Sequence, residues 1–305
     1  MQIQAKPSEQ VTIYDVAREA GVSDATVSRV FNNKDNVRES TRDRVLIAAK
    51  KLGYVANQQA RILAGGKSNI MGLLVPGLDT AYVAEIVRGI DVELSHSNYE
   101  MMVYTTRRRG GDEASYLQYI ANGLSAGLLL VVPLLSPDYL KTLSNLKYPY
   151  VLIDEIDETD NSFSVVATNR QGGYDATRYL IELGHRRIAF IKGISDLHSS
   201  ASRLDGYLSA LEDCHVPVHQ EYIVNGDFMQ SSGYNQTQSL LALPEPPTAI
   251  FAANDVMALG AMDAIRIRGL EIPGDISLIG FDDIPQAFTT HPKLTTVRQP
   301  LEEMG

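Results

Sequence analysis

Apolar residues are spaced in two different ways along this chain, and the change near residue 70 divides it in two. Before this point they recur every three or four positions, as in VTIYDVAREAG (11–21) and VSDATVSRVFNN (22–33). That spacing predicts short amphipathic helices. After it, short β-rich runs are separated by stretches with helical spacing, such as YVAEIVRGIDVELS (82–95) and NRQGGYDATRYLIELG (169–184). This alternation is typical of parallel sheets covered by helices.

The two helices before residue 33 have the start and stop signals of a helix-turn-helix. Thr12 is placed to cap the first helix, Gly21 falls in the turn, and Ser23 is placed to cap the second helix. On the second helix Val27 and Val30 share one face, which predicts packing against the first helix. The opposite face carries Asp24, Ala25, Ser28 and Arg29. We interpret that face as one that meets the major groove of DNA.

A third helix is predicted in the segment NKDNVRESTRDRVLIAAKKLGY (33–54), where Ser40 or Thr41 could cap its start and Gly53 ends it. Val45, Leu46, Ala49 and Leu52 supply its apolar face. The next segment, NQQARILAGGKS (57–68), contains helix-forming residues followed by two glycines. A helix this short is marginal alone in water, so we expect it to form when docked and to act as a hinge.

Nine β-rich runs follow. They are IMGLLVP (70–76), EMMVYTT (100–106), GLLLVVPL (127–134), YVLID (150–154), FSVVAT (163–168), RIAFIKG (187–193), YIVNGDF (222–228), AIFAAND (249–255) and ISLIGFDD (276–283). Because nine strands exceed what one mononucleotide-binding unit usually holds, we expect two α/β lobes, each a doubly wound parallel sheet.

Several of these strands end in polar residues. Ligands of open α/β sheets bind beyond the carboxyl ends of the strands, so we expect these residues to face a common cleft. The predicted cleft residues are Asp154, Asp227, Phe228, Asn254, Asp255, Asp282 and Asp283, with Asp79 and Tyr82 after the first strand and Arg203 after RIAFIKG. Carboxylates, an amide and an arginine beside an aromatic ring form the chemistry that binds a polyol. Phe228 is the candidate for the ring.

Charge is distributed unevenly. Residues 1–68 hold 11 basic and 7 acidic residues, and the other 237 hold 16 basic and 30 acidic ones, which gives the net charge of −10. A basic module on an acidic body confines the attraction for phosphates to one end. No apolar run reaches membrane-spanning length, the N-terminus lacks a signal-peptide layout, and the single Cys214 fits a reducing cytoplasm. Near Asp282 and Asp283 no histidine or cysteine stands at a metal-ligand spacing, so we expect no metal and no cofactor.

Seven blocks occur in a recognisable order. They are VTIYDVAREAGVSDATVSRVFNN, GYVANQQARILAGGKS, LGHRRIAFI, SRLDGY, AIFAANDVMALGAM, GDISLIGFDDIP and LTTVRQP. Together they resemble the lactose/galactose-repressor (LacI/GalR) family over nearly the whole chain. The resemblance implies an N-terminal all-α helix-turn-helix bundle, a hinge helix, and an α/β core of two doubly wound parallel-sheet lobes similar to periplasmic sugar-binding proteins. It also implies a homodimer that reads a palindromic double-stranded DNA operator in the cytoplasm, associated with the nucleoid.

The resemblance assigns DNA-binding positions. Asp24 and Ala25 fall where the family reads bases, and Arg29 where an arginine contacts DNA. Leu63 matches a hinge leucine that is levered into the minor groove, where an apolar wedge unstacks one base step. The polar positions near phosphates are Thr12, Tyr14, Ser23, Thr26, Ser28 and Asn32, and the other hinge positions are Asn57 and Ala60.

The resemblance also assigns the effector positions, which are Tyr82, Asp154, Arg203, Phe228, Asn254 and Asp282; the loop residue Asp79 completes the predicted set. Val83 stands where the family commonly has a second aromatic residue, which puts the identity of the effector in doubt. Ala56 replaces a proline that usually precedes the hinge. We expect a family member to continue beyond Gly305 for roughly another helix and strand, so the C-terminus is expected to be truncated.

These interpretations predict a helix-turn-helix domain over residues 1–56, a hinge over 57–68 and an effector-binding core over 69–305. Its lobes are expected to span about 69–165 with 297–305, and 166–296.

Three functions remain open at this point. The first is a DNA-binding transcriptional regulator, a repressor, controlled by a sugar or sugar derivative in the cleft. The second is a regulator controlled by a purine-like corepressor or a protein partner; purines prefer stacking on two aromatic rings, and only Phe228 and Tyr82 are available. The third is an α/β enzyme with a DNA-binding appendage, which lacks a nucleophile–base pair at a recognisable spacing. We expect no enzymatic activity.

Overall fold

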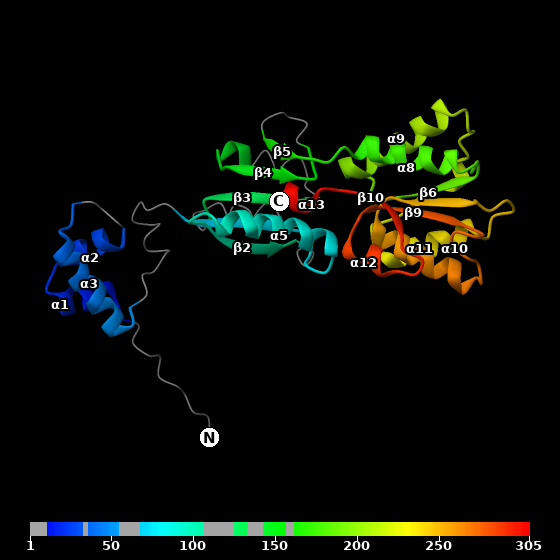
Figure 1. Cartoon of the computed structure of the whole chain (residues 1–305). Helices are drawn as coiled ribbons and strands as arrows, with labels where there is room; N and C mark the ends of the chain where they lie inside the picture. The colour runs from blue at the N-terminus through cyan, green and yellow to red at the C-terminus, as the bar shows by residue number, and fades with distance from the viewer. Residues whose placement is uncertain (1–10, 33–35, 55–67, 107–124, 133–142, 157–161) are drawn as a thin grey trace, which may run out of the picture. The chain divides into compact units, whose positions relative to one another are not determined.

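The computed structural model describes residues 11–32, 36–54, 68–106, 125–132, 143–156 and 162–305 (Figure 1). The chain forms two compact units that divide near Ile70. Ala56 and the hinge positions Asn57, Ala60 and Leu63 lie outside the described residues.

The first unit contains three described helices, α1 (Ile13–Ala20), α2 (Asp24–Phe31) and α3 (Glu39–Leu52). Gly21 ends α1 with a φ of 64° and Gly53 ends α3 with a φ of 66°, and this left-handed backbone is one that glycine adopts at little cost. Both predicted stops are confirmed. The buried residues of the three helices form one small core: Val16, Ala17, Ala20, Val27, Val30, Val45, Ala48 and Ala49.

The start of α3 differs from the prediction. Arg38 is its N-cap and makes no side-chain capping hydrogen bond, while Ser40 and Thr41 lie inside the first turn. The prediction was based on the residue types that favour the N-cap position. In the structure the backbone is extended at Arg38, and the helix begins directly after it. Leu46 was also wrong as a core residue, because its side chain is 46% exposed.

The second unit holds two parallel sheets, each with five described strands. The first sheet has the order β2-β1-β3-β4-β5 and the second has the order β10-β9-β8-β6-β7. The strands of the first sheet are β1 (Ile70–Val75), β2 (Glu100–Thr105), β3 (Gly127–Val131), β4 (Tyr150–Ile153) and β5 (Phe163–Val165). Those of the second are β6 (Ile188–Lys192), β7 (Ile223–Asn225), β8 (Ala249–Ala252), β9 (Ser277–Asp282) and β10 (Thr295–Arg298). All pairs of neighbouring strands among the described residues are parallel, as predicted. In β1, for example, Leu73 pairs with Val103 of β2 on one side and with Leu129 of β3 on the other.

Helices connect and cover these strands (Figure 1). They are α5 (Ala81–Ser95), α8 (Asn169–Glu182), α9 (His198–Asp213), α10 (Gln230–Leu240), α11 (Asp255–Ile267), α12 (Pro285–Thr289) and α13 (Leu301–Met304), with a short 3-10 helix, η1 (Gln220–Tyr222). Among the described helices, none is long and apolar enough to cross a membrane.

Both faces of the central strands are buried, which explains their nearly continuous apolar runs. In β1, Leu73 and Val75 pack on one side of the sheet with α5, and Leu74 packs on the other side with Leu128 and Leu130 of β3. The second sheet is enclosed by one large core that includes Phe190, Phe251 and Phe281. Each sheet therefore forms the rigid centre of one lobe.

Strand β10 is absent from the nine predicted runs. It has only four residues, TTVR, none of them buried, and it lies at the edge of the second sheet beside β9. From there the chain returns to the first lobe, where Leu301 and Met304 of α13 join the core beneath α5.

Candidate functional site

The N-termini of α1 and α2 carry the predicted caps. The backbone amide and the hydroxyl of Thr12 both donate to the carboxylate of Asp15, at 2.9 Å and 2.7 Å. Ser23 Oγ accepts a hydrogen bond from the backbone amide of Thr26 at 3.2 Å. Both N-caps are therefore confirmed, and the exposed start of α2 presents the positive end of a helix dipole.

The two faces of α2 differ as predicted. Val27 and Val30 are buried in the core of the first unit, and Asp24, Ala25 and Arg29 are exposed. Among the remaining predicted DNA-binding positions, Thr12, Tyr14 and Ser23 are exposed and Thr26, Ser28 and Asn32 are half-buried. Asn32 Nδ2 donates to Ser28 Oγ at 3.3 Å across one helical turn. This hydrogen bond holds the Ser28 and Asn32 side chains together next to Arg29.

In the second unit, all seven predicted effector positions line one cavity of about 390 Å³. They are Asp79, Tyr82, Asp154, Arg203, Phe228, Asn254 and Asp282. Asp227 lines the cavity as well, whereas Asp255 and Asp283, also predicted to face the cleft, are not among its lining residues. The cavity size falls within the usual range of small-molecule sites, roughly 300 to 1,000 Å³. Apolar residues make up much of the remaining wall, and they include Val83, Val132, Ile194, Leu197, Met229 and Val256.

Strand ends aim these side chains into the cavity. Asp154 follows β4 with a φ of 59°, Asp282 ends β9 with a φ of 124°, and Phe228 follows β7 with a φ of 67°. Positive φ is uncommon for residues other than glycine and marks positions where the surrounding structure over-determines the backbone. Here it turns each side chain out of the pleat at the carboxyl end of its strand.

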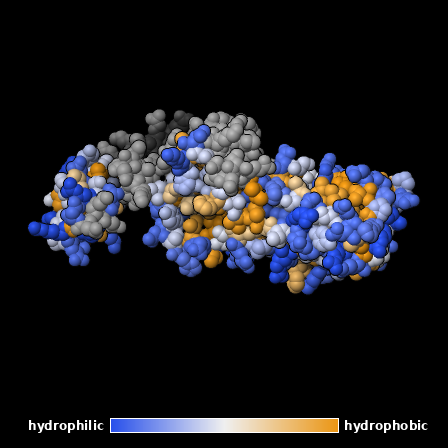
Figure 2. All heavy atoms as spheres, turned by 90° about the horizontal axis from the view of Figure 1, so that it is seen from above, coloured by the Kyte–Doolittle hydropathy of each residue, from blue (hydrophilic) through white to orange (hydrophobic). Residues whose placement is uncertain are grey.

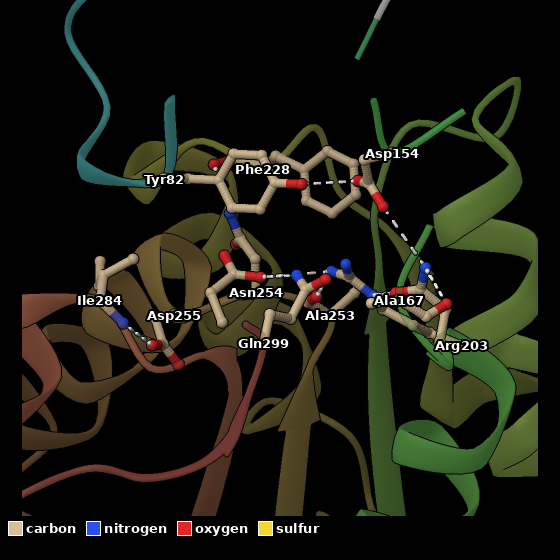
Figure 3. A network of polar contacts seen from close by, with 12 residues as sticks. Tyr82, Asp154, Ala167, Arg203, Phe228, Ala253, Asn254, Asp255, Ile284 and Gln299 are labelled. Carbon is tan, nitrogen blue, oxygen red and sulfur yellow. Dashed lines mark hydrogen bonds and ion pairs between the residues drawn. The ribbon is translucent and has the colours of Figure 1, made fainter. Parts of the chain in front are cut away.

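A chain of polar contacts joins the two lobes across this cavity (Figure 3). Tyr82 from α5 donates its hydroxyl to Asp154 at 2.8 Å, and Asn169 at the start of α8 approaches the other oxygen of Asp154 at 3.4 Å. The oxygen of the Asn169 side chain accepts from Arg203 Nε at 2.9 Å. Asp154 belongs to the first lobe and Arg203 to the second, so the network connects the two lobes.

Arg203 is only 2% exposed. Its Nη1 donates to the carbonyl of Ala253 at 2.6 Å and lies 3.7 Å from Asp282. Its guanidinium is 4.0 Å from the ring centre of Phe281 and 6.0 Å from that of Phe228. Its charge is therefore fixed in place by an acid, a carbonyl and two rings.

The ring of Phe228 is seated by two neighbours. A Cβ atom added to Gly193 would overlap the ring, so the close approach depends on glycine at this position. Asn254 Nδ2 donates to the Phe228 carbonyl at 3.2 Å, while its Oδ1 caps α11 by accepting from the Met257 amide at 2.9 Å. Asn254 thus both lines the cavity and holds the backbone of Phe228.

Burial also changes the acid–base properties of the site. It raises the pKa of Asp282 well above the ordinary value of 3.8, against the opposing influence of Arg203. Burial likewise raises the pKa of Asp255 to about 6, although the hydroxyl of Thr296 and the amide of Ile284 donate to its carboxylate at 2.6 Å and 2.9 Å. The pKa of Tyr82 is raised by burial and by the adjacent Asp154.

Sequence reasoning missed several residues of this site. Asn169 links Asp154 to Arg203, and Gln299 donates to Asp282 Oδ1 at 2.7 Å. Ser199 lines the cavity, and Gly193 seats Phe228. Gly193 could have been found, because it ends the run RIAFIKG at the carboxyl edge of β6. Asn169 begins α8 and Gln299 follows the short strand β10, and neither position carries a comparable signal. Among the described residues, no group of three or more histidines, cysteines or carboxylates could hold a metal ion.

Comparisons with known proteins agree over nearly the whole chain. Residues 12–57 match the family described as bacterial regulatory proteins, lacI family, and residues 177–305 match the periplasmic binding protein-like domain. Catabolite control protein A of Priestia megaterium is 36% identical over 296 residues, which cover 97% of this chain and 89% of that protein.

Two solved structures are similar as well. One is the lac repressor dimer bound to operator and the anti-inducer ONPF, with 32% identity, a TM-score of 0.84, and coverage of 96% of this chain and 89% of that one. The other is a complex of the transcriptional regulator CelR with cellobiose, with 34% identity, a TM-score of 0.73 and the same two coverages.

Proposed function

The chain belongs to the LacI family of bacterial regulatory proteins, and from that premise we propose that it is a transcriptional repressor whose operator affinity is set by a sugar-class effector. The observation that carries the proposal is the cavity, where all seven residues expected to bind an effector converge. Carboxylates, an amide and a guanidinium beside the Phe228 ring suit hydroxyl groups and the apolar face of a sugar ring. The cellobiose complex of a similar regulator supports the same ligand class.

The helix α2 is proposed to enter the major groove. Its exposed Asp24, Ala25 and Arg29 face outward, and the Ser23 cap places amides where a phosphate could be bound. Asp24 can accept only from the amino group of a cytosine or an adenine, and Ala25 offers only a methyl group. Arg29 is therefore the main base or phosphate donor of this helix.

Additional specificity is proposed to come from the hinge. We assign Asn57, Ala60 and Leu63 to a minor-groove element in which Leu63 acts as the wedge. An apolar wedge unstacks a base step at a cost of a few kcal/mol, and the bent duplex then gains further protein contacts. The domain boundaries at residues 56 and 68 remain part of this proposal.

The effector is proposed to act by changing the relation of the two lobes. Tyr82 and Asp154 belong to the first lobe, and Asn169 and Arg203 to the second, and they form one buried network. A ligand that bonds to Asp154 or Arg203 competes with this network and shifts the lobe equilibrium by its differential affinity. The shift reaches DNA through the hinge.

We further propose that the repressor is a homodimer on a palindromic operator in the nucleoid. A single three-helix module makes too few contacts for specific affinity, and the similar lac repressor is a dimer on its operator. Apolar areas are visible on the surface of the second unit (Figure 2). Its exposed apolar side chains include Val92 in α5, Tyr99 in the loop after α5, and Met102 in β2.

The experiment that tests the effector proposal is a thermal-shift screen of the full-length protein with sugars, sugar derivatives and purines. A sugar that raises the melting temperature of the wild-type protein and fails with Phe228→Ala supports the proposal. Stabilisation by purines alone would replace the sugar with a purine-like corepressor. Catalytic turnover of a bound sugar that is lost in Asp282→Asn would instead indicate an enzyme.

A further inference from the structure

The charges around the cavity are unequal. Among the described residues that line it, the acidic ones are Asp79, Asp154, Asp227 and Asp282, and the only basic one is Arg203. Arg203 lies 3.7 Å from Asp282, and both side chains are 2% exposed. The pair is neutral when Asp282 is ionised, and when Asp282 holds its proton Arg203 balances only one of the other acids. The other acids give the described wall an excess of negative charge.

Asp154 contributes most to this excess. It is 3% exposed, and the groups that donate hydrogen bonds to it, the Tyr82 hydroxyl and the Asn169 amide, are neutral. A buried charge is screened far less by salt than a surface charge. Asp227 is exposed, so its repulsion adds a smaller and salt-dependent part.

The apolar part of the wall opposes charge of either sign. Val83, Val132, Ile194, Leu197 and Val256 can offer no hydrogen bond to an ion that has lost its water. A cationic ligand would also have to approach the buried guanidinium of Arg203. Hydroxyl groups meet no such penalty, because they can donate to Asp154 and accept from Arg203.

We infer that the cavity selects an uncharged sugar or glycoside and rejects phosphorylated sugars, sugar acids and nucleotides. This inference rests on the proposed role of the cavity as the effector site. It narrows the ligand class beyond a sugar or sugar derivative. One buried carboxylate about 8 Å from a monoanion weakens binding by roughly tenfold or more at an effective dielectric constant of about 20.

The test uses matched sets of ligands with the full-length protein at constant ionic strength. The sugar sets are glucose, glucosamine, glucose 6-phosphate and glucuronate, the corresponding galactose compounds, and cellobiose with cellobionate. A purine set of adenine, adenosine and AMP allows the charge rule to be tested even if the effector is not a sugar. Thermal shift identifies binding sets, and isothermal titration calorimetry then gives the dissociation constants within each set.

We expect the uncharged member of a binding set to bind at least about thirtyfold more tightly than its phosphate or carboxylate. In Asp154→Asn, which removes the charge and keeps the shape, this ratio is expected to fall by about tenfold. The ratio is the readout because Asp154 also belongs to the binding site.

Three outcomes would overturn the inference. The first is a charged compound, whether a phosphate, a carboxylate or an amine, whose dissociation constant is within threefold of that of its uncharged counterpart, or lower. This outcome counts whichever residues of the protein contact the charged group. The second is a ratio unchanged by Asp154→Asn. The third is the absence of binding by every compound of every set, which contradicts both the effector role and the inference. Rejection of AMP together with binding of adenosine and of no sugar would instead support the charge rule and contradict the sugar proposal.

Discussion

At the scale of single residues, the proposed effector site depends on side chains whose positions are set by their neighbours. Asp154, Phe228 and Asp282 could be predicted, because the carboxyl ends of parallel strands converge. Their supports could not. Asn169 becomes important only because the two lobes bring it between Asp154 and Arg203, and that meeting is a property of the folded chain.

Gly193 offers a direct test of such support. In Gly193→Ala the new methyl group would occupy the space of the Phe228 ring, so the ring must move away from its seat. We expect effector affinity to fall by at least about tenfold, the effect of a small misplacement in a packed site. Calorimetric titration of the full-length protein measures it. Gly274→Ala is the matched control, because its Cβ would meet only the Glu271 side chain at ordinary contact distance. An equal loss of effector affinity in both variants would contradict the role of Gly193 in making room for the Phe228 ring.

The raised pKa of Asp255 predicts that the stability of the folded protein depends on pH. Its pKa of about 6 in the folded protein lies above the ordinary value of 3.8, so the folded state holds a proton that the unfolded state releases between these values. This contribution to the free energy of unfolding is therefore complete at low pH and is lost as the pH rises through about 6. Asn at this position cannot titrate.

The measurement compares urea unfolding of the wild type and Asp255→Asn at pH 7.5 and pH 4.5. The difference in the free energy of unfolding, wild type minus variant, is expected to rise by about 2 kcal/mol at the lower pH. A difference that stays constant or falls would show that burial does not raise the pKa of Asp255.

At the scale of elements, strong patterns were predictable and weak ones were not. The central strands are buried on both faces, so their apolar runs stand out in the sequence, whereas β10 is a four-residue edge strand with no buried residue. The helix stops at Gly21 and Gly53 were predictable, because left-handed backbone strongly favours glycine. The start of α3 was not, since its N-cap, Arg38, is not a typical capping residue.

The caps of the N-terminal helices can be compared in one experiment. Ser23→Ala removes the side-chain acceptor of the Thr26 amide, so it should destabilise the three-helix unit by about 1 kcal/mol. Ser40→Ala removes a similar hydroxyl that lies within the first turn of α3, and it should change stability by less than about 0.5 kcal/mol. Thermal unfolding of the full-length protein, followed by NMR signals of residues 12–54, measures both. Equal losses of stability in the two variants would contradict the claim that Ser23 acts as an N-cap and Ser40 does not.

At the scale of the whole molecule, we propose that specificity for DNA is shared between α2 and the hinge. The exposed face of α2 has a single long basic side chain, Arg29, which limits how many bases it can read. Leu63 should therefore contribute substantially through DNA bending. In Leu63→Ala we expect operator affinity to fall at least tenfold and the bend to decrease, as measured by binding titrations and by energy transfer between the operator ends. Unchanged affinity and bend would exclude the wedge.

The central claim is that the cavity controls DNA binding. The most direct measurement is the operator affinity of the full-length protein, on a site selected from random DNA, with and without saturating effector. We expect a change of about 5- to 150-fold, the usual range of allosteric coupling, and its loss in Phe228→Ala. An effector that binds in the cavity and leaves operator affinity unchanged would contradict the account.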